Sequence, residues 1–190
     1  MKPVFLSLLM LASLPLLYGQ DFVNGSFEGE SQDAVIPVGW HICPPNTTPD
    51  IFPGVWGVFK ESADGNTYVG LITRPDGSYE SIGQRIPLEL KTGQCYQLGF
   101  FLSHSDQYAG FSDPIVCRIW LGKQKGERGQ LIFESKAVDD TDWQEIDVNF
   151  RCKKEWKYII IEASFPEENL KAKGNILIDG LGAIKPCDQA

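Results

Sequence analysis

The sequence predicts an all-β protein, an antiparallel β-sandwich of the jelly-roll type. The main observation is residues 94–105, in which apolar side chains occupy every second position: Tyr96, Leu98, Phe100 and Leu102. Alternate residues of a strand point to opposite faces, so this stretch is interpreted as a long strand with one face in a core. About ten such short segments follow one another with turn signals between them, and no convincing amphipathic helix is found.

The expected strands are separated by turns rich in Gly, Pro, Asn and Asp. They occupy residues 22–28, 38–43, 67–73, 79–86, 94–105, 115–122, 130–138, 143–150, 156–165 and 175–184. Residues 44–57, PPNTTPDIFPGVWG, are expected to be an irregular loop because proline lacks the backbone N–H. Residues 143–150 have the clearest half-buried pattern, whereas residues 156–165 are apolar at both parities, which predicts burial on most of both faces.

The first residues have the features of a secretory signal peptide. Lys2 precedes an apolar run at residues 4–17, and the small Gly19 offers a cleavage point. A membrane anchor is the weaker interpretation, because a spanning helix needs about 20 apolar residues. We therefore expect a signal peptide at residues 1–19, no transmembrane segment, a single β-sandwich domain at residues 20–190, and an exported location: periplasmic, cell surface or secreted.

The charge balance argues against nucleic acid as a partner. Lys and Arg total 17 against 25 Asp and Glu, which gives a formal net charge of −8, and no basic patch interrupts this acidity. No catalytic signature is recognisable either, so no catalytic residue is predicted. The acidic pairs at residues 139–140 and 167–168 are interpreted as solvated turn residues rather than as the acid and base of a glycosidase.

Five cysteines in an exported chain predict at least one disulfide, and their spacing matches no zinc pattern. If the strands that carry Cys95 and Cys152 pair antiparallel, both sulfurs fall at one end of the sheet, so we expect a Cys95–Cys152 bridge. Cys117 shares its parity with apolar neighbours and is expected to be a buried free thiol. Cys43 and Cys187 remain as a possible second pair.

Two acidic residues near the chain ends are candidates for a metal site. Glu28 ends NGSFE in the first expected strand, and Asp179 lies in the last. Terminal strands of a sandwich often lie side by side, and two adjacent buried carboxylates would repel unless a hard cation such as Ca²⁺ neutralised them. Asn24 is a further candidate ligand. The alternative, favoured by spacing alone, is that the two acids merely cap turns beside Gly29 and Gly180.

Aromatic and arginine side chains on shared strand faces predict a binding surface for sugars, whose flat C–H faces stack on aromatic rings. Parity places Arg118 with Trp120, and Tyr79 with Arg85. The loop aromatics Trp56 and Tyr108 are expected to flank such a face. The alternative for each aromatic is ordinary packing in the core or at its rim.

With these motifs in hand, the chain resembles the galactose-binding-like jelly-roll domains, the superfamily of many carbohydrate-binding modules. VNGSFEG at the start and ILIDGLGAI at the end are similar to the terminal strands of that superfamily. More narrowly, PVGW, TPDIF, DGNTYVGL, GQCYQLGFFLS and TDWQEIDVNF resemble a domain of secreted and surface proteins of gliding-type gram-negative bacteria.

The resemblance implies a structural calcium held by Glu28 and Asp179, because the matching Glu and Asp hold it in the sugar-binding relatives. It also implies an exported, non-catalytic module that binds a glycan or polysaccharide. The alternative is a protein–protein interaction or surface adhesion module that uses the same face. A small glycan hydrolase or lyase is the third possibility.

Overall fold

The computed structural model describes residues 21–187 and has eleven β-strands and no helix among them. The predicted signal peptide lies outside these described residues. The strands are β1 (His41–Ile42), β2 (Asp50–Phe52), β3 (Tyr68–Ile72), β4 (Ser81–Arg85), β5 (Cys95–Ser103), β6 (Ile115–Gly122), β7 (Gln130–Val138), β8 (Gln144–Arg151), β9 (Tyr158–Ser164), β10 (Asn175–Asp179) and β11 (Lys185–Pro186).

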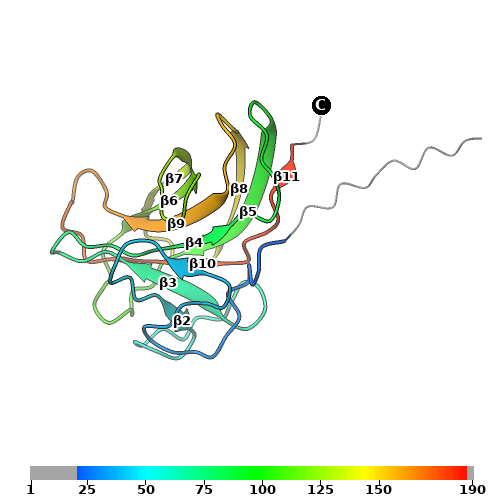
Figure 1. The fold of residues 1–190 in the computed structure, drawn as a ribbon. Helices are drawn as coiled ribbons and strands as arrows, with labels where there is room; N and C mark the ends of the chain where they lie inside the picture. Colours follow the sequence, from blue (N-terminus) through cyan, green and yellow to red (C-terminus); the bar gives the residue numbers. More distant parts are fainter. Residues whose placement is uncertain (1–20, 188–190) are drawn as a thin grey trace, which may run out of the picture.

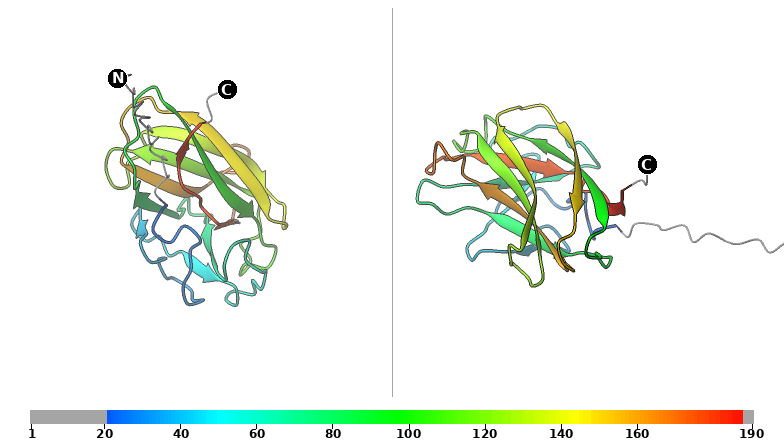
Figure 2. Two further views of the ribbon diagram at one scale, coloured as in Figure 1. Left: turned by 90° about the vertical axis from the view of Figure 1, so that its right-hand side faces the viewer. Right: turned by 90° about the horizontal axis from the view of Figure 1, so that it is seen from above.

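The strands form two antiparallel sheets packed face to face (Figure 1). Sheet A has the order β2-β3-β10-β5-β8, and β11 pairs with β5 as well. Sheet B has the order β1-β4-β9-β6-β7. Neighbours in both sheets come from distant parts of the chain, as the mixed colours of Figure 2 show. The expected all-β sandwich is confirmed.

The core fills the space between the inner faces of the two sheets. In β5 the burial alternates as the sequence predicts: Tyr96, Leu98 and Phe100 are at most 2% exposed, whereas Gln97 and Gly99 face outward and are half-buried. Sheet B contributes Ile119 from β6 and Ile161 from β9, both fully buried. This burial of apolar side chains supplies the main stabilisation of the sandwich.

The structure corrects three expected elements. Residues 22–28 form turns rather than a strand, because the Asn24 side chain accepts the N–H of Glu28 and donates to its carbonyl. β2 lies inside the proline-rich segment expected to be irregular, and its three residues pair with β3. The expected last strand, residues 175–184, is shorter in the structure: β10 ends at Asp179, where Gly180 takes a positive φ of 56°, and β11 lies beyond the expected range.

The disulfide joins Cys95 to Cys187, so the expected Cys95–Cys152 bridge and the possible Cys43–Cys187 pair are both wrong. β5 and β8 do pair antiparallel, but Cys95 shares the outward parity of Gln97, whereas Cys152 points into the core and is 1% exposed. Two neighbouring strand residues that point to opposite faces cannot be bridged. Cys117 is a buried free thiol, as predicted.

Candidate functional site

The outer face of sheet B carries rows of side chains set by the strand register. One row crosses four strands and contains His41, Gly83, Ile160 and Trp120. The next row contains Ser81, Glu162, Arg118 and Glu134. Residues directly opposite each other in a sheet point to the same face, so these side chains form one surface. We call this surface the sheet B face.

Charged groups converge on Glu162 near the centre of the sheet B face. Its side chain is 2% exposed, and its Oε2 lies 2.9 Å from Arg128 Nε. Burial raises the pKa of Glu162, and the positive charges of Arg128 and Arg118 oppose the rise. Arg118 also lies 2.5 Å from Glu134 and donates to Ser164 Oγ at 2.7 Å. The face therefore holds a buried carboxylate between two guanidinium groups.

Three buried polar atoms among residues 21–187 have no hydrogen-bond partner, and all three lie on the sheet B face. They are His41 Nε2, Trp120 Nε1 and Glu162 Oε2. Arg128 is at ion-pair distance from Glu162 and the Trp120 indole faces it, yet neither N–H has hydrogen-bond geometry towards Oε2. Buried polar groups in native proteins are nearly always bonded, so these three atoms are exceptions, and they are gathered on one face.

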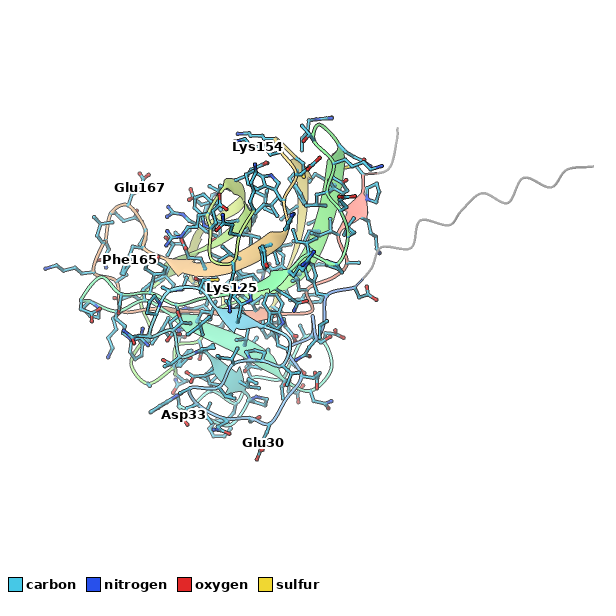
Figure 3. The ribbon with its side chains drawn as sticks, in the orientation of Figure 1. Glu30, Asp33, Lys125, Lys154, Phe165 and Glu167 are labelled. Atoms are coloured by element: carbon cyan, nitrogen blue, oxygen red, sulfur yellow. A yellow bond between two sulfur atoms is a disulfide. The ribbon has the colours of Figure 1, made fainter. Side chains whose placement is uncertain are left out.

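Residues 123–129, the connection between β6 and β7, cross over this face. A Cβ atom at Gly126 would lie 3.6 Å from the carbonyl oxygen of Cys43, just past β1. Further along the segment, the Arg128 guanidinium lies 5.0 Å from the centre of the Tyr79 ring. Burial lowers the pKa of His41, and the positive charge of Lys125, which Figure 3 labels, lowers it further. The His41 imidazole is therefore neutral at neutral pH.

Cys43 and His41 meet on the sheet B face but do not form an activated nucleophile. A Cβ atom at Gly83 would lie 3.0 Å from both Cys43 Sγ and His41 Nε2. Burial raises the pKa of the Cys43 thiol to about 11. Since the thiolate is the reactive form, a neutral thiol beside a neutral imidazole is a poor nucleophile.

The sheet B face brings together three of the six predicted ligand residues: Arg118, Trp120 and Tyr79. Arg85 shares the face but lies at its other end, opposite Tyr158. Six residues separate it from Tyr79, which is about 20 Å along a strand. Trp56 and Tyr108 do not flank this face. They lie against the outer side of sheet A, so the expectation about their position is wrong.

Sequence reasoning missed Glu162, His41 and Arg128. Glu162 was recognisable, because it is the one charged residue inside the apolar run YIIIEAS of β9. His41 and Arg128 gave no comparable signal, since a two-residue strand and a crossing loop bring them to the face.

The proposed calcium ligands Glu28 and Asp179 lie beside the same loop. Glu28 Oε1 accepts the N–H of Asn66 at 2.7 Å, and Asp179 Oδ2 accepts the N–H groups of Ala63 and Asp64, both at 2.8 Å. The first turns of the domain do lie beside the end of β10, because the N–H of Leu181 donates to the carbonyl of Gly25, but they do not pair as two strands. Burial raises the pKa of Asp179 to about 6.

The donor set at this place fits a hard cation in type. Glu28 Oε2 and Asp179 Oδ1 each have spare lone pairs, and oxygen is the ligand atom that Ca²⁺ takes. Among residues 21–187 no group of three or more His, Cys, Asp or Glu side chains could hold a metal ion. The two carboxylates would therefore need backbone carbonyls to complete a site. The Asn24 amide is already bonded to both backbone groups of Glu28.

Comparison with solved structures identifies the fold. The xylan-binding domain CBM22-1 of Xyn10C from Paenibacillus barcinonensis aligns over 90% of this chain and 97% of its own, with 13% identity and a TM-score of 0.57. A second neighbour, family 16 carbohydrate binding module-2, covers 86% of this chain and 98% of its own, with 16% identity and a TM-score of 0.52. The chain has the jelly-roll β-sandwich fold of these domains.

This jelly roll also occurs in an enzyme. A cyclase from Fischerella sp. TAU aligns over 90% of this chain and all of its own, with 12% identity and a TM-score of 0.63. No protein-family model matches the chain. No curated protein matches it either. The resemblance to domains of gliding-type bacteria stays a prediction.

Proposed function

We propose that the chain is an exported, non-catalytic carbohydrate-binding module that takes a glycan on the sheet B face. The observation that carries this proposal is the convergence on that face of three buried polar atoms without a hydrogen bond, on His41, Trp120 and Glu162, of which the Glu162 oxygen is ion-paired with Arg128. Binding sites commonly combine apolar surface with a few placed polar groups. The likeness of the fold to xylan-binding and other carbohydrate-binding modules supports the same function.

The chemistry of the face matches that of a sugar. A hydroxyl group both donates and accepts a hydrogen bond, so it can donate to Glu162 Oε2 or accept from Trp120 Nε1. The Arg118 guanidinium, 28% exposed, offers further donors at the rim. The half-buried indole of Trp120 provides a flat surface on which the C–H groups of a sugar ring stack. The acidic surface of the protein suits a neutral glycan better than an anionic one.

Separate observations support the absence of catalysis and the export of the protein. The Cys43 thiol is neutral, and the sequence has no other recognisable nucleophile motif. The Cys95–Cys187 disulfide fits an oxidising compartment outside the cytoplasm. Among the described residues, no helix has the length and apolarity needed to cross a membrane. A periplasmic, surface or secreted location is part of this proposal.

A structural calcium between Glu28 and Asp179 is the second part of the proposal. The ion would neutralise two carboxylates that bond to the same loop, and it would join the first turns of the domain to the end of β10. Such an ion supplies stability to the fold and takes no part in sugar binding.

The proposal is tested on a broad glycan array, followed by titration of the bound glycan into variants. Trp120→Ala is expected to weaken binding at least tenfold. Trp143→Ala is the matched control, because it removes a half-buried indole that lies just before β8 and contacts Tyr68 of sheet A, and it is expected to leave binding unchanged.

Thermal unfolding shows whether Trp120→Ala weakens binding directly or by destabilising the fold. Trp120→Ala should lower the stability far less than Trp156→Ala, because Trp156 is 5% exposed in the core and such truncations cost about 3–5 kcal/mol. If the wild type binds nothing on the array, the sugar-binding function is refuted and the protein-partner alternative takes its place. Turnover of a bound glycan would refute the non-catalytic part.

A further inference from the structure

A cavity of about 330 Å³ lies at the outer side of sheet A, away from the sheet B face. Residues of the segments after β2 and β5 and of the end of β3 line it. Figure 1 shows β2 and β3 in the lower part of the molecule. Asp33 is at this end of the molecule in Figure 3. Its aromatic lining is Trp56, Tyr108 and Phe111, and its charged lining is Asp33, Asp50 and Arg74. We call it the sheet A pocket.

Unfavourable backbone conformations are concentrated at the sheet A pocket. Six described residues other than glycine have positive φ, and three of them line this pocket: Ala34 at 53°, Trp56 at 50° and Ala109 at 46°. The N–H of Ala109 donates to the carbonyl of Trp56 at 3.1 Å, so two strained residues hold each other in place. Such strain persists where the surrounding structure imposes it, and it is concentrated at functional sites.

The strained backbone presents a large aromatic surface to solvent. Trp56 is 49% exposed, which is unusual for an indole that could be buried elsewhere. Tyr108, which lines the same pocket, is 1% exposed and packs edge-on against Phe52, with ring centres 4.8 Å apart. The pocket therefore combines an exposed indole with a buried aromatic ring that is held in place.

Polar groups beside this surface are held in place by buried partners. Asp50 is 6% exposed and accepts hydrogen bonds from the Tyr108 hydroxyl and, at 2.7 Å, from the N–H of Ala34. Arg74 is fixed by the fully buried Glu80 at 2.6 Å, and its side chain remains 26% exposed. The pocket thus has a positioned acceptor and a positioned donor within one small volume.

We propose that the sheet A pocket is a second carbohydrate site, which takes a single sugar ring stacked on Trp56. The carboxylates of Asp50 and Asp33 accept bonds from its hydroxyl groups, and Arg74 donates to them. The volume is at the lower end of the range of ligand pockets, roughly 300–1,000 Å³, which suits one ring rather than a longer chain. This site does not depend on the proposed function of the sheet B face.

An organic cation is the competing ligand, because three aromatic rings and two carboxylates can also surround an ammonium group. The structure disfavours it. Lys173 Nζ already lies 4.5 Å from the centre of the Phe111 ring, and the Arg74 guanidinium forms part of the wall. A bound cation would therefore meet two positive charges, whereas a neutral sugar would use Arg74 as a donor.

The test uses ¹⁵N-labelled protein, in which each tryptophan gives one indole N–H signal. The signals of Trp56 and Trp120 are assigned from Trp→Phe variants. The probes are glucose, galactose, mannose, xylose, arabinose, N-acetylglucosamine and glucuronic acid, with choline as the cationic probe. We expect at least one sugar to shift the Trp56 signal, and Trp56→Ala to weaken the binding of that sugar at least tenfold. Phe59→Ala removes an exposed aromatic ring outside the pocket lining and is expected to leave this affinity unchanged.

A shift of the Trp56 signal by choline alone, or by none of the probes, would overturn the proposal, as would an unchanged affinity in Trp56→Ala. A sugar that shifts only Trp120 would support the sheet B face and refute the second site. Melting temperatures test the backbone strain at Trp56 separately from sugar binding. Glycine tolerates positive φ, so Trp56→Gly should melt at a higher temperature than Trp56→Ala, although both variants lose sugar binding.

Discussion

Glu162 has the least favourable electrostatic environment on the sheet B face, because its carboxylate is buried in the middle of an apolar strand. Arg128 and Arg118 offset this, and they come from a loop and a neighbouring strand. Removing one partner of a buried charge is costly because the remaining charge is left without compensation. Arg128 is 41% exposed, so solvent screens part of its contribution.

Arg128→Ala is expected to destabilise the protein by about 1–2 kcal/mol at neutral pH. The loss should be larger at pH 8 than at pH 5. Burial raises the folded-state pKa of Glu162 above its usual 4.5, so the ionised carboxylate costs stability as pH rises between the unfolded and folded values. Without Arg128 the pKa of Glu162 in the folded protein rises further, so the pH range over which stability is lost extends to higher pH. Denaturant unfolding at the two pH values measures the effect.

The double variant Arg128→Ala with Glu162→Gln is the control, because the neutral amide does not need the guanidinium. It should recover most of the stability lost at pH 8. Equal losses at pH 5 and pH 8 in Arg128→Ala would contradict the account of Glu162 as a buried charge.

Short terminal elements depend on attachments that longer strands do not need. β11 has two residues, pairs with β5 beside Tyr96, and is covalently joined to that strand through Cys95 and Cys187. The bridge closes a long loop, with a sequence separation of 92. Cross-links that close long loops remove the most conformational freedom from the unfolded chain.

Cys187→Ser is expected to lower the free energy of unfolding by about 2–4 kcal/mol. Reductant should destabilise the wild type by a similar amount and leave the variant unchanged. Cys43→Ser is the control, since Cys43 is a free thiol, and this variant should keep its sensitivity to reductant. If reductant does not move the unfolding midpoint of the wild type, the bridge does not contribute as described.

For the molecule as a whole, the calcium prediction concerns how the two ends of the domain are held together. Glu28 belongs to the first turns, Asp179 ends β10, and both bond to the loop before β3. In the absence of an ion, burial raises the pKa of Asp179 from 3.8 to about 6, so stability is lost as the pH rises between these two values and is not regained above them. Bound calcium would reverse the sign, because it stabilises the charged form.

Calcium is therefore expected to raise the melting temperature, and the increase should be larger at pH 7 than at pH 5. The protonated carboxylate at the lower pH is a poor ligand. At about 100 times its dissociation constant, the ion would contribute about 2.7 kcal/mol. Melting in chelator and in added Ca²⁺ at both pH values measures this effect. Asp179→Asn should abolish it, and magnesium serves as the control ion. A melting curve that calcium does not change at pH 7 would contradict the prediction.

By itself the sequence determined the all-β class, the bounds of β6 and β7, and the inward face of β5, because alternation and turn chemistry are local properties of the chain. It also placed Arg118 with Trp120 on one face. Only the tertiary structure decided which side chains meet there. His41 and Glu162 lie on the same surface as Trp120 through the order β1-β4-β9-β6, which joins strands far apart in the chain.

The disulfide and the loop aromatics Trp56 and Tyr108 show the same difference between what the sequence determines and what the tertiary structure decides. The parity of Cys95 was readable, but its partner depended on a two-residue strand that returns to β5 from the end of the domain. Trp56 and Tyr108 gave no periodic signal, because loop residues follow backbone turns and not a strand pleat. Their meeting beside Asp50 came from the packing of two loops over sheet A. Sequence patterns specify faces, whereas register and loop packing specify neighbours.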